Sequence, residues 1–514
     1  MGRHTAFQLR DDILRMSMSA GHAAAGGLHC VSILHKQSAP QPDFKMHKDS
    51  IRSSASKSAA GNQRHTSAQR AASLTDILSR SDLRLTAEDS VTPAGYSLLA
   101  RLILSDALWS SPKGESPERS DIHPVRIPSL QSHRLSLDSL YGQEHGILPG
   151  LSDDSGIRFR IGLTEISGGV GHSSRHLPHD LSRNETGRAN LADQGNDENL
   201  LFSQFLLIWM KLHNLIADRL AAHECPQPAI HARDLVVWHF HQIILRDFLP
   251  KIALAARKPE PESVGTRTLP TDSEWVMAMQ CLWPGMQRQS YELNENFQEK
   301  PVDSAQLEAL TGAGGIVPVP SNWIIDWRRF FSFRSISTGY EEAIHFNRCT
   351  KLDPMAAAAA NPEFVSSAIK SSLSGIDNPD RICARFGLAP LSEQKIRAAL
   401  PDALLAEISL CQNDARSNSE MPLWLYLMLE AALEQNGNRP GTLGATIIQN
   451  GIKALLRDDT ESAELDLPDF PGRAEVLSLP LTDGIPARSL AELIAIIDAT
   501  SPLISPLDDS RYGM

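Results

Sequence analysis

The chain has 514 residues, of which 41% are hydrophobic and 21% charged, and it carries a net charge of −12. This length and apolar share allow a large buried core, and the negative charge argues against general nucleic-acid binding. The sequence contains no run of eighteen apolar residues, so we predict no transmembrane helix. We also expect no secretory signal at the N-terminus. The six cysteines form no Cys-x-x-Cys pair. We therefore expect free thiols in a soluble protein that is cytoplasmic rather than secreted.

The beginning of the chain differs in composition from the rest. Residues 45–70 are rich in serine, alanine and basic residues and contain few large apolar side chains. Such a segment buries too little surface to offset the entropy that is lost on ordering. We therefore expect residues 1–79 to form a disordered arm and residues 80–505 to form one folded domain.

Two long helices are the clearest elements of this domain. Apolar side chains recur at three- and four-residue steps over residues 197–222, and a second set runs over residues 233–249. Asp197 and Glu198 begin the first helix, where carboxylates favour the helix dipole, and Pro250 is expected to end the second. Shorter helices are predicted at residues 304–310, 403–410, 422–433, 444–456 and 489–497, and a short strand at 157–162. The predicted fold class is mainly α.

Several motifs in and around these helices resemble those of animal-type haem peroxidases. The run Gly195-Asn-Asp-Glu-Asn, followed by Lys211-Leu-His-Asn, is similar to the central helix of that family, and Asp247-Phe-Leu-Pro250 is similar to the end of its next helix. Further matches are Asp138-Ser-Leu-Tyr-Gly142, Asp180-Leu-Ser-Arg183, Ser290-Tyr-Glu-Leu-Asn294, Ile325-Asp-Trp-Arg-Arg-Phe-Phe331 and Pro422-Leu-Trp-Leu-Tyr426. Seven motifs in family order over residues 90–500 imply a large single-domain helical haem-peroxidase fold with little β structure, in its shorter, bacterial-like form.

The resemblance also implies which positions should carry the haem chemistry. A haem peroxidase needs a proximal histidine on the iron, a distal histidine that moves a proton, and a distal arginine that stabilises developing charge. At the equivalent positions this chain has Pro284, Ser105 and Gly195. Proline offers no iron ligand and is expected to break a helix, while a serine without a neighbouring base does not act as one near neutral pH. Arg101 and Leu104 replace a glutamine and an aspartate of the distal motif.

Remnants of two cofactor sites are also implied. Asn378 and Arg381 resemble the asparagine and arginine of the family's haem pocket. A calcium site is implied by four oxygen-bearing residues, namely Asp106, Ser132, Ser136 and Asp138. Because one of these positions is usually aspartate and calcium affinity follows the number of carboxylates, we expect a weakened site.

The histidines give weaker indications of function. His172, His176 and His179 lie close together, but the surrounding glycines and Pro178 disfavour the helix that would align them for a metal. His239 and His241 are two apart on a helix and should face different sides. His213 and Asn214 match a family pair with a structural role.

Two functions follow from these observations. The first is a pseudoenzyme that has lost haem or binds it weakly, and that is retained for binding or scaffolding with a protein or small-molecule partner. The alternative is a haem-dependent peroxidase or oxygenase with a non-standard axial ligand. The simultaneous replacement of five positions in the haem motifs favours the pseudoenzyme.

Overall fold

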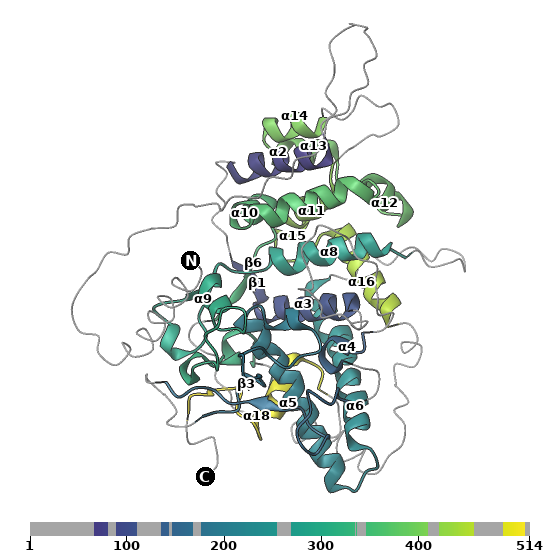
Figure 1. Cartoon of the computed structure of the whole chain (residues 1–514). Coiled ribbons are helices and arrows are strands. Elements are labelled where there is room, and N and C mark those ends of the chain that lie inside the picture. Colours follow the sequence, from purple (N-terminus) through teal and green to yellow (C-terminus); the bar gives the residue numbers. More distant parts are fainter. Residues whose placement is uncertain are drawn as a thin grey trace, which may run out of the picture.

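Helices build most of the protein, and its strands are short. The computed structural model describes residues 66–80, 89–109, 135–142, 146–167, 176–253, 269–334, 336, 346–409, 421–456 and 487–508. Within these ranges, the strands form three two-stranded antiparallel sheets. The predicted mainly α class with little β structure is confirmed (Figure 1).

The helices and strands of the described residues have the following bounds. The helices are α2 (Ser67–Arg80), α3 (Gly95–Leu108), α4 (Asp138–Tyr141), α5 (Leu200–Ala222), α6 (Pro228–Ile243), α7 (Leu249–Ile252), α8 (Asp272–Gly285), α9 (Ser304–Ala309), α10 (Pro354–Ala360), α11 (Pro362–Gly375), α12 (Pro379–Arg385), α13 (Glu393–Ala399), α14 (Asp402–Ser409), α15 (Leu423–Gln435), α16 (Thr442–Leu455) and α18 (Leu490–Asp498). The strand pairs are β1 (Asp89–Pro93) with β6 (Arg348–Thr350), β2 (Ile161–Gly162) with β3 (Asp180–Leu181), and β4 (Ser290–Tyr291) with β5 (Val302–Asp303).

All five shorter predicted helices are confirmed, as α9, α14, α15, α16 and α18. Their ends differ from the predicted ends by no more than two residues. The strand candidate at residues 157–162 is reduced to its last two residues, which form β2. The long helix predicted from residue 197 begins instead at Leu200. Its start is set by Asn199, whose backbone is extended and whose side chain accepts a hydrogen bond from the Leu201 N–H at 2.9 Å. Residues 194–197 form a separate 3₁₀ turn, η1.

Helix α5 is the central helix of the molecule. It is the one helix of the described residues that is long and apolar enough to cross a membrane, but 89% of its most apolar window is buried inside the protein. Helices α6 and α18 pack against it, and α3 contacts it as well (Figure 1). Its hydrophobicity on nearly all sides is therefore explained by neighbouring helices of the same chain.

The prediction that the next helix runs from Arg233 and ends at Pro250 is wrong at both ends. Helix α6 begins at Pro228, and helical backbone continues through a π turn at Ile244–Phe248 into α7. Pro250 lies in the first turn of α7, where a missing N–H is tolerated. The π turn contains Asp247, whose carboxylate accepts hydrogen bonds from the Tyr96 hydroxyl at 2.8 Å and from the Leu490 N–H at 2.9 Å. This one carboxylate connects α3, α18 and the end of α6.

Helix α8 joins the two ends of the molecule. It packs against α3 on one side and against α11, α15 and α16 on the other (Figure 1). A capping box fixes its start, since the side chains of Thr271 and Glu274 each accept a hydrogen bond from the other residue's N–H. A Cβ atom at Gly451 of α16 would lie 1.9 Å from Trp275 Cδ1, so the close approach of α16 to α8 requires glycine.

The predicted boundary between an arm at residues 1–79 and a domain from residue 80 is wrong for Ser67–Arg80. These residues form α2, which packs on α10, α11 and α14 (Figure 1). Its buried residues, Ala71, Leu74, Thr75 and Leu78, recur at helical spacing, and the three apolar ones join the hydrophobic core that extends to Ile504. Residues 1–65 lie outside the described part of the chain, so the predicted disorder of the remaining arm stays a prediction.

Substituting Leu74 with alanine should therefore destabilise the whole domain. Leu74 is 1% exposed, and truncating a fully buried leucine typically lowers the free energy of unfolding by about 2–5 kcal/mol. The matched control is Asp76→Ala, which removes an exposed ion pair with Arg80 on the same helix and should have little effect. Urea denaturation of both variants measures the difference. Equal stability of the parent chain and of a chain that starts at residue 80 would contradict the assignment of α2 to the core.

Candidate functional site

Helix α3 carries the segment that resembles the distal haem motif. All of its residues from Gly95 to Ala107 are buried. At its start a Cβ on Gly95 would come within 2.0 Å of the Phe331 ring, so the helix is packed closely from its first residue. Polar side chains in such a helix must find partners inside the protein, because water does not reach them.

Arg101 is the polar side chain at the centre of α3, and it is 4% exposed. Its Nη2 donates a hydrogen bond to the Gly195 carbonyl at 3.0 Å and lies 3.2 Å from the Glu198 carboxylate. Its guanidinium carbon lies 4.1 Å from the ring centre of Phe202 and 5.1 Å from that of Trp283. Burial lowers the pKa of Arg101, and the carboxylates of Glu198 and Asp193 act in the opposite direction. Arginine nevertheless stays charged, so this is a buried cation between α3, α5, η1 and α8.

Of the three positions expected to converge on a haem cavity, Gly195 and Ser105 lie beside this cation. Gly195 contacts it directly, and Pro284 follows Trp283 in the chain. Ser105 lies one helical turn after Arg101 on the same face of α3; it is 4% exposed, and its hydroxyl has no hydrogen-bond partner among the described residues. Pro284 does not break its helix in the middle, because it lies in the last turn of α8, which ends at Gly285.

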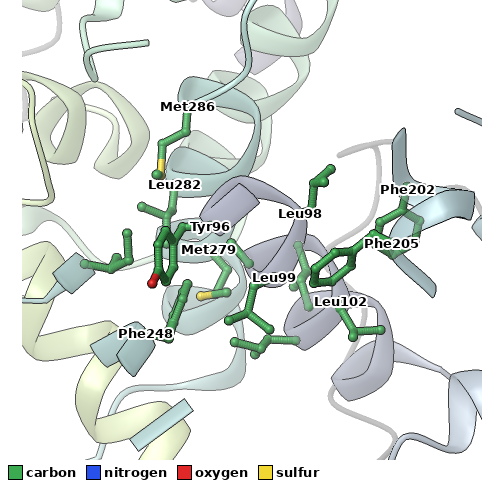
Figure 2. Close-up of a cluster of buried hydrophobic side chains, with 14 of the residues drawn as sticks. Tyr96, Leu98, Leu99, Leu102, Phe202, Phe205, Phe248, Met279, Leu282 and Met286 are labelled. Atoms are coloured by element: carbon green, nitrogen blue, oxygen red, sulfur yellow. The ribbon is translucent and has the colours of Figure 1, made fainter. Parts of the chain in front are cut away.

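Helices α3 and α8 are in direct contact at this place. Figure 2 shows apolar side chains of α3, among them Leu98, Leu99 and Leu102, packed between Phe202 and Phe205 of α5 and Met279 and Leu282 of α8. The haem that the resemblance implies would have to lie between the distal segment on α3 and the proximal segment on α8. Packed apolar side chains and the Arg101 guanidinium occupy that region, so the residues as they stand do not fit a haem.

The remnant residues of the expected haem pocket have local roles. The Asn378 side chain caps α12, accepting hydrogen bonds from the N–H groups of Asp380 at 2.8 Å and Arg381 at 3.3 Å. The Arg381 side chain is 68% exposed and lies 3.9 Å from Asp377. Such exposure does not fit a role in a buried cofactor pocket.

The residues expected to bind calcium are brought together, but they bind protein groups. Asp106 is fully buried and accepts hydrogen bonds from the N–H groups of Leu137 at 2.8 Å and Ser139 at 3.0 Å. Asp138 pairs with Arg233 of α6, whose guanidinium also donates to the Ser136 carbonyl at 3.4 Å. Ser132 lies outside the described residues. The guanidinium of Arg233 thus supplies a positive charge at the place where the resemblance implies a metal ion.

The histidines bind protein groups as well. His172 lies outside the described residues, and the described ranges contain no group of three histidine, cysteine or acidic residues arranged to hold a metal. His176 Nδ1 lies 2.6 Å from the Thr164 carbonyl, and His213 lies between the Tyr141 hydroxyl and the Ile157 carbonyl, at 3.0 Å from each. His239 contacts the Leu235 carbonyl and His241 the Leu135 carbonyl, so the two imidazoles face different groups. The expected structural role of His213 agrees with these contacts.

His179 forms the most unusual of these contacts. Its Nδ1 lies 3.3 Å from Nζ of Lys211, and both residues are buried. Burial lowers the pKa of Lys211 to about 7, and the nearby Asp498 carboxylate opposes this change. Burial and the Lys211 ammonium together keep the pKa of His179 well below its ordinary value. Sequence reasoning did not single out Lys211, because its burial depends on β3 and α18, which are distant in the chain.

The thiols agree with the expectation of free cysteines where they are described. Cys225, Cys281, Cys349 and Cys383 are free and buried. Burial raises the pKa of Cys383 to about 11 and the pKa of Cys281 well above its ordinary range, so these thiols are not reactive thiolates near neutral pH. The other two cysteines, Cys30 and Cys411, lie outside the described residues.

Comparisons with known proteins give structural likeness only. No protein-family profile and no curated protein sequence matches the chain. Among solved structures, peroxidase A from Dictyostelium discoideum is similar with a TM-score of 0.43 and 12% identity, over 82% of this chain and 90% of that chain. A fatty acid alpha-dioxygenase from Oryza sativa is similar with a TM-score of 0.45 and 12% identity, over 86% of this chain and 81% of that chain.

The role of Arg233 can be tested with calcium. Arg233→Ala leaves Asp138 without its cation, and removing one partner of a largely buried ion pair typically costs about 3 kcal/mol. We expect calcium to leave the melting temperature of the unmodified protein unchanged, relative to a chelator, and to raise that of Arg233→Ala. The control is Arg160→Ala, which removes a surface pair with Asp154 and should show neither effect. A calcium-dependent rise in the unmodified protein would show that the metal still binds.

Lys211 should make stability depend on pH in the alkaline range. Its folded pKa is about 7, whereas an unfolded lysine titrates near 10.4, so between these values the unfolded state binds more protons. The free energy of unfolding should therefore rise with pH, by about 1 kcal/mol per unit between about pH 7.5 and 10. Lys211→Met should lack this rise, while Lys370→Met, which changes an exposed lysine, should keep it. Parallel pH profiles for Lys211→Met and the parent would contradict this prediction.

Proposed function

We propose that this chain is a haem-peroxidase-like protein that has lost the haem chemistry and is retained for binding or scaffolding. The ordered motifs over residues 90–500 support the ancestry. The loss of chemistry is supported first by the residue types at the three functional positions. Ser105, Gly195 and Pro284 supply neither an iron ligand, nor a general acid–base group, nor a cation for developing charge.

The observation that carries this proposal is the position of Arg101. A lost ligand alone would leave a cavity that another residue or cofactor could use. Here, a side chain from the distal segment extends to Gly195 and to Trp283, and so crosses from the distal to the proximal side of the expected cavity. Stacking on Phe202 and the ion pair with Glu198 hold it there. The guanidinium acts as an internal substitute that keeps α3, α5 and α8 together without a cofactor.

The same argument extends to the calcium site. Arg233 neutralises Asp138 and contacts the Ser136 carbonyl, which are the groups that a metal ion would use there. The Asp106 carboxylate accepts three hydrogen bonds, from the N–H of Leu137 and from the N–H and hydroxyl of Ser139. We propose that Arg101 and Arg233 have both replaced cofactors as structural cations, which leaves a helical scaffold that is complete without haem or calcium.

Haemin binding tests the proposal. We expect the purified protein to show no Soret band of histidine-ligated haem, with or without added haemin, and no turnover of a phenolic donor above that of free haemin. Loss of one acid–base group alone typically lowers such rates about a hundred- to ten-thousand-fold. Stoichiometric haem in the purified protein, together with peroxidase turnover, would overturn the proposal of a pseudoenzyme. It would favour the alternative function, a haem-dependent peroxidase or oxygenase with a non-standard axial ligand.

Back-substitution separates the role of Arg101 from that of the lost ligands. The triple variant Ser105→His, Gly195→Arg, Pro284→His restores the residue types but keeps Arg101 in the cleft, and should gain no Soret band. Adding Arg101→Gln should open the space and allow some haem to bind. Arg101→Gln alone is the control and should bind none. If the triple variant binds haemin as well as the quadruple variant, Arg101 does not fill the site.

A further inference from the structure

A pocket lies on the far side of α5 from Arg101. It has a volume of about 420 Å³, and its lining includes Lys211, Asn214, Leu215 and Arg219 of α5 together with Thr500 and Ser501 after α18. Lys211 and Phe202, which stacks on Arg101, are nine residues apart, or about two and a half helical turns, and therefore point to opposite sides of α5. The pocket is thus separate from the expected haem cleft, and its role does not depend on what occupies that cleft.

Lys211 is a buried residue of the pocket lining, with only 5% of its surface exposed. The charged and titratable groups around it are His179 near β3, Asp498 of α18, and Asp218 and Arg219 further along its own helix. The carboxylate of Asp498 accepts hydrogen bonds from the N–H groups of Leu503 and Ile504, both at 2.7 Å, so it is held in place by the loop that follows α18. Lys211 thus has its amine beside the His179 imidazole, and the residue borders the pocket.

Arg219 supplies the second feature of the pocket. It lies two helical turns after Lys211 on the same side of α5, and it lines the pocket. Among the described residues no carboxylate pairs with it, since its neighbour Asp218 is paired with Arg158 at 3.3 Å. A guanidinium without an internal acid is suited to bind the carboxylate of a ligand.

We propose that this pocket binds a small oxo-acid, and that Lys211 forms an imine with the ligand's carbonyl carbon while Arg219 binds its carboxylate. The neutral amine attacks the carbonyl carbon and forms the C–N bond. The carbonyl oxygen takes up the two protons of the amine and leaves as water, so that one imine and one water result from one amine and one carbonyl. Leu215, Thr500 and Ser501 also line the pocket that would hold the ligand.

The protonation state of Lys211 supports this reaction. Burial brings its pKa to about 7. At about pH 7 roughly half of such an amine is neutral, compared with fewer than about one in a thousand for a lysine with an ordinary pKa. Only the neutral amine is a nucleophile, so carbonyl compounds should select Lys211 over exposed lysines near neutral pH.

Reductive trapping tests the proposal on the full chain. The protein is incubated near neutral pH with succinic semialdehyde and cyanoborohydride, which reduces an imine to a stable secondary amine, and labelled peptides are quantified by mass spectrometry. We expect Lys211 to be labelled at least about tenfold more than Lys370, an exposed lysine of α11. Labelling that follows solvent exposure, with Lys370 above Lys211, would overturn the imine.

Butanal tests the role of Arg219, because it has the same aldehyde but no carboxylate. We expect it to label Lys211 several-fold less than the semialdehyde does. Arg219→Gln, a change at the rim of the pocket, should reduce labelling by the semialdehyde to the level of butanal and leave labelling by butanal unchanged. Equal labelling by both aldehydes in the unmodified protein, or no effect of Arg219→Gln, would overturn the proposed recognition of a carboxylate. Because these measurements use proteins that retain Lys211, they do not require Lys211→Met to fold.

Discussion

The centre of this molecule depends on one buried cation. Arg101 lies where three helices and a 3₁₀ turn meet, and its guanidinium has to be stabilised without water. A buried charge is tolerated only when it is paired and hydrogen-bonded. Here the Glu198 carboxylate, the Gly195 carbonyl and the face of Phe202 provide that stabilisation. Through these contacts Arg101 links η1 and the end of α8 to α3.

This constraint explains why glycine at position 195 is consistent with the packing. Gly195 is used only through its backbone, because its carbonyl accepts a hydrogen bond from Arg101 and its N–H donates one to Asp193. Similarly, a proline in the last turn of α8 costs little, because the helix ends one residue later. The glycine and the proline at these two positions are thus compatible with the packing around the arginine.

The sequence predicted the helical class and the positions of α5, α6, α9, α14, α15, α16 and α18 because periodic apolar residues are a local property. Helix α2 was not predicted, because the composition of the serine-rich stretch around it indicated disorder. Its four buried residues at helical spacing, Ala71, Leu74, Thr75 and Leu78, were therefore overlooked. The π turn in the helix before Pro250 was also not predicted, because it depends on Asp247 reaching Tyr96, 151 residues earlier. The positions expected to carry haem chemistry were assigned from motif spacing and stay a prediction, whereas the contact between Arg101 and Gly195 joins residues 94 apart and leaves no local pattern.

Helix α5 links the two sites of this protein. One face packs Phe202 and Phe205 against α3 and Arg101, while the opposite face carries Lys211 and Arg219, which line a pocket. Packing on the first face helps to fix the position of the second face, because both belong to one helix. A buried amine requires such rigidity, since water that entered around Lys211 would solvate its charged form and raise its pKa toward the ordinary value. Close packing around Arg101 on one side of α5 therefore favours a preorganised amine on the other.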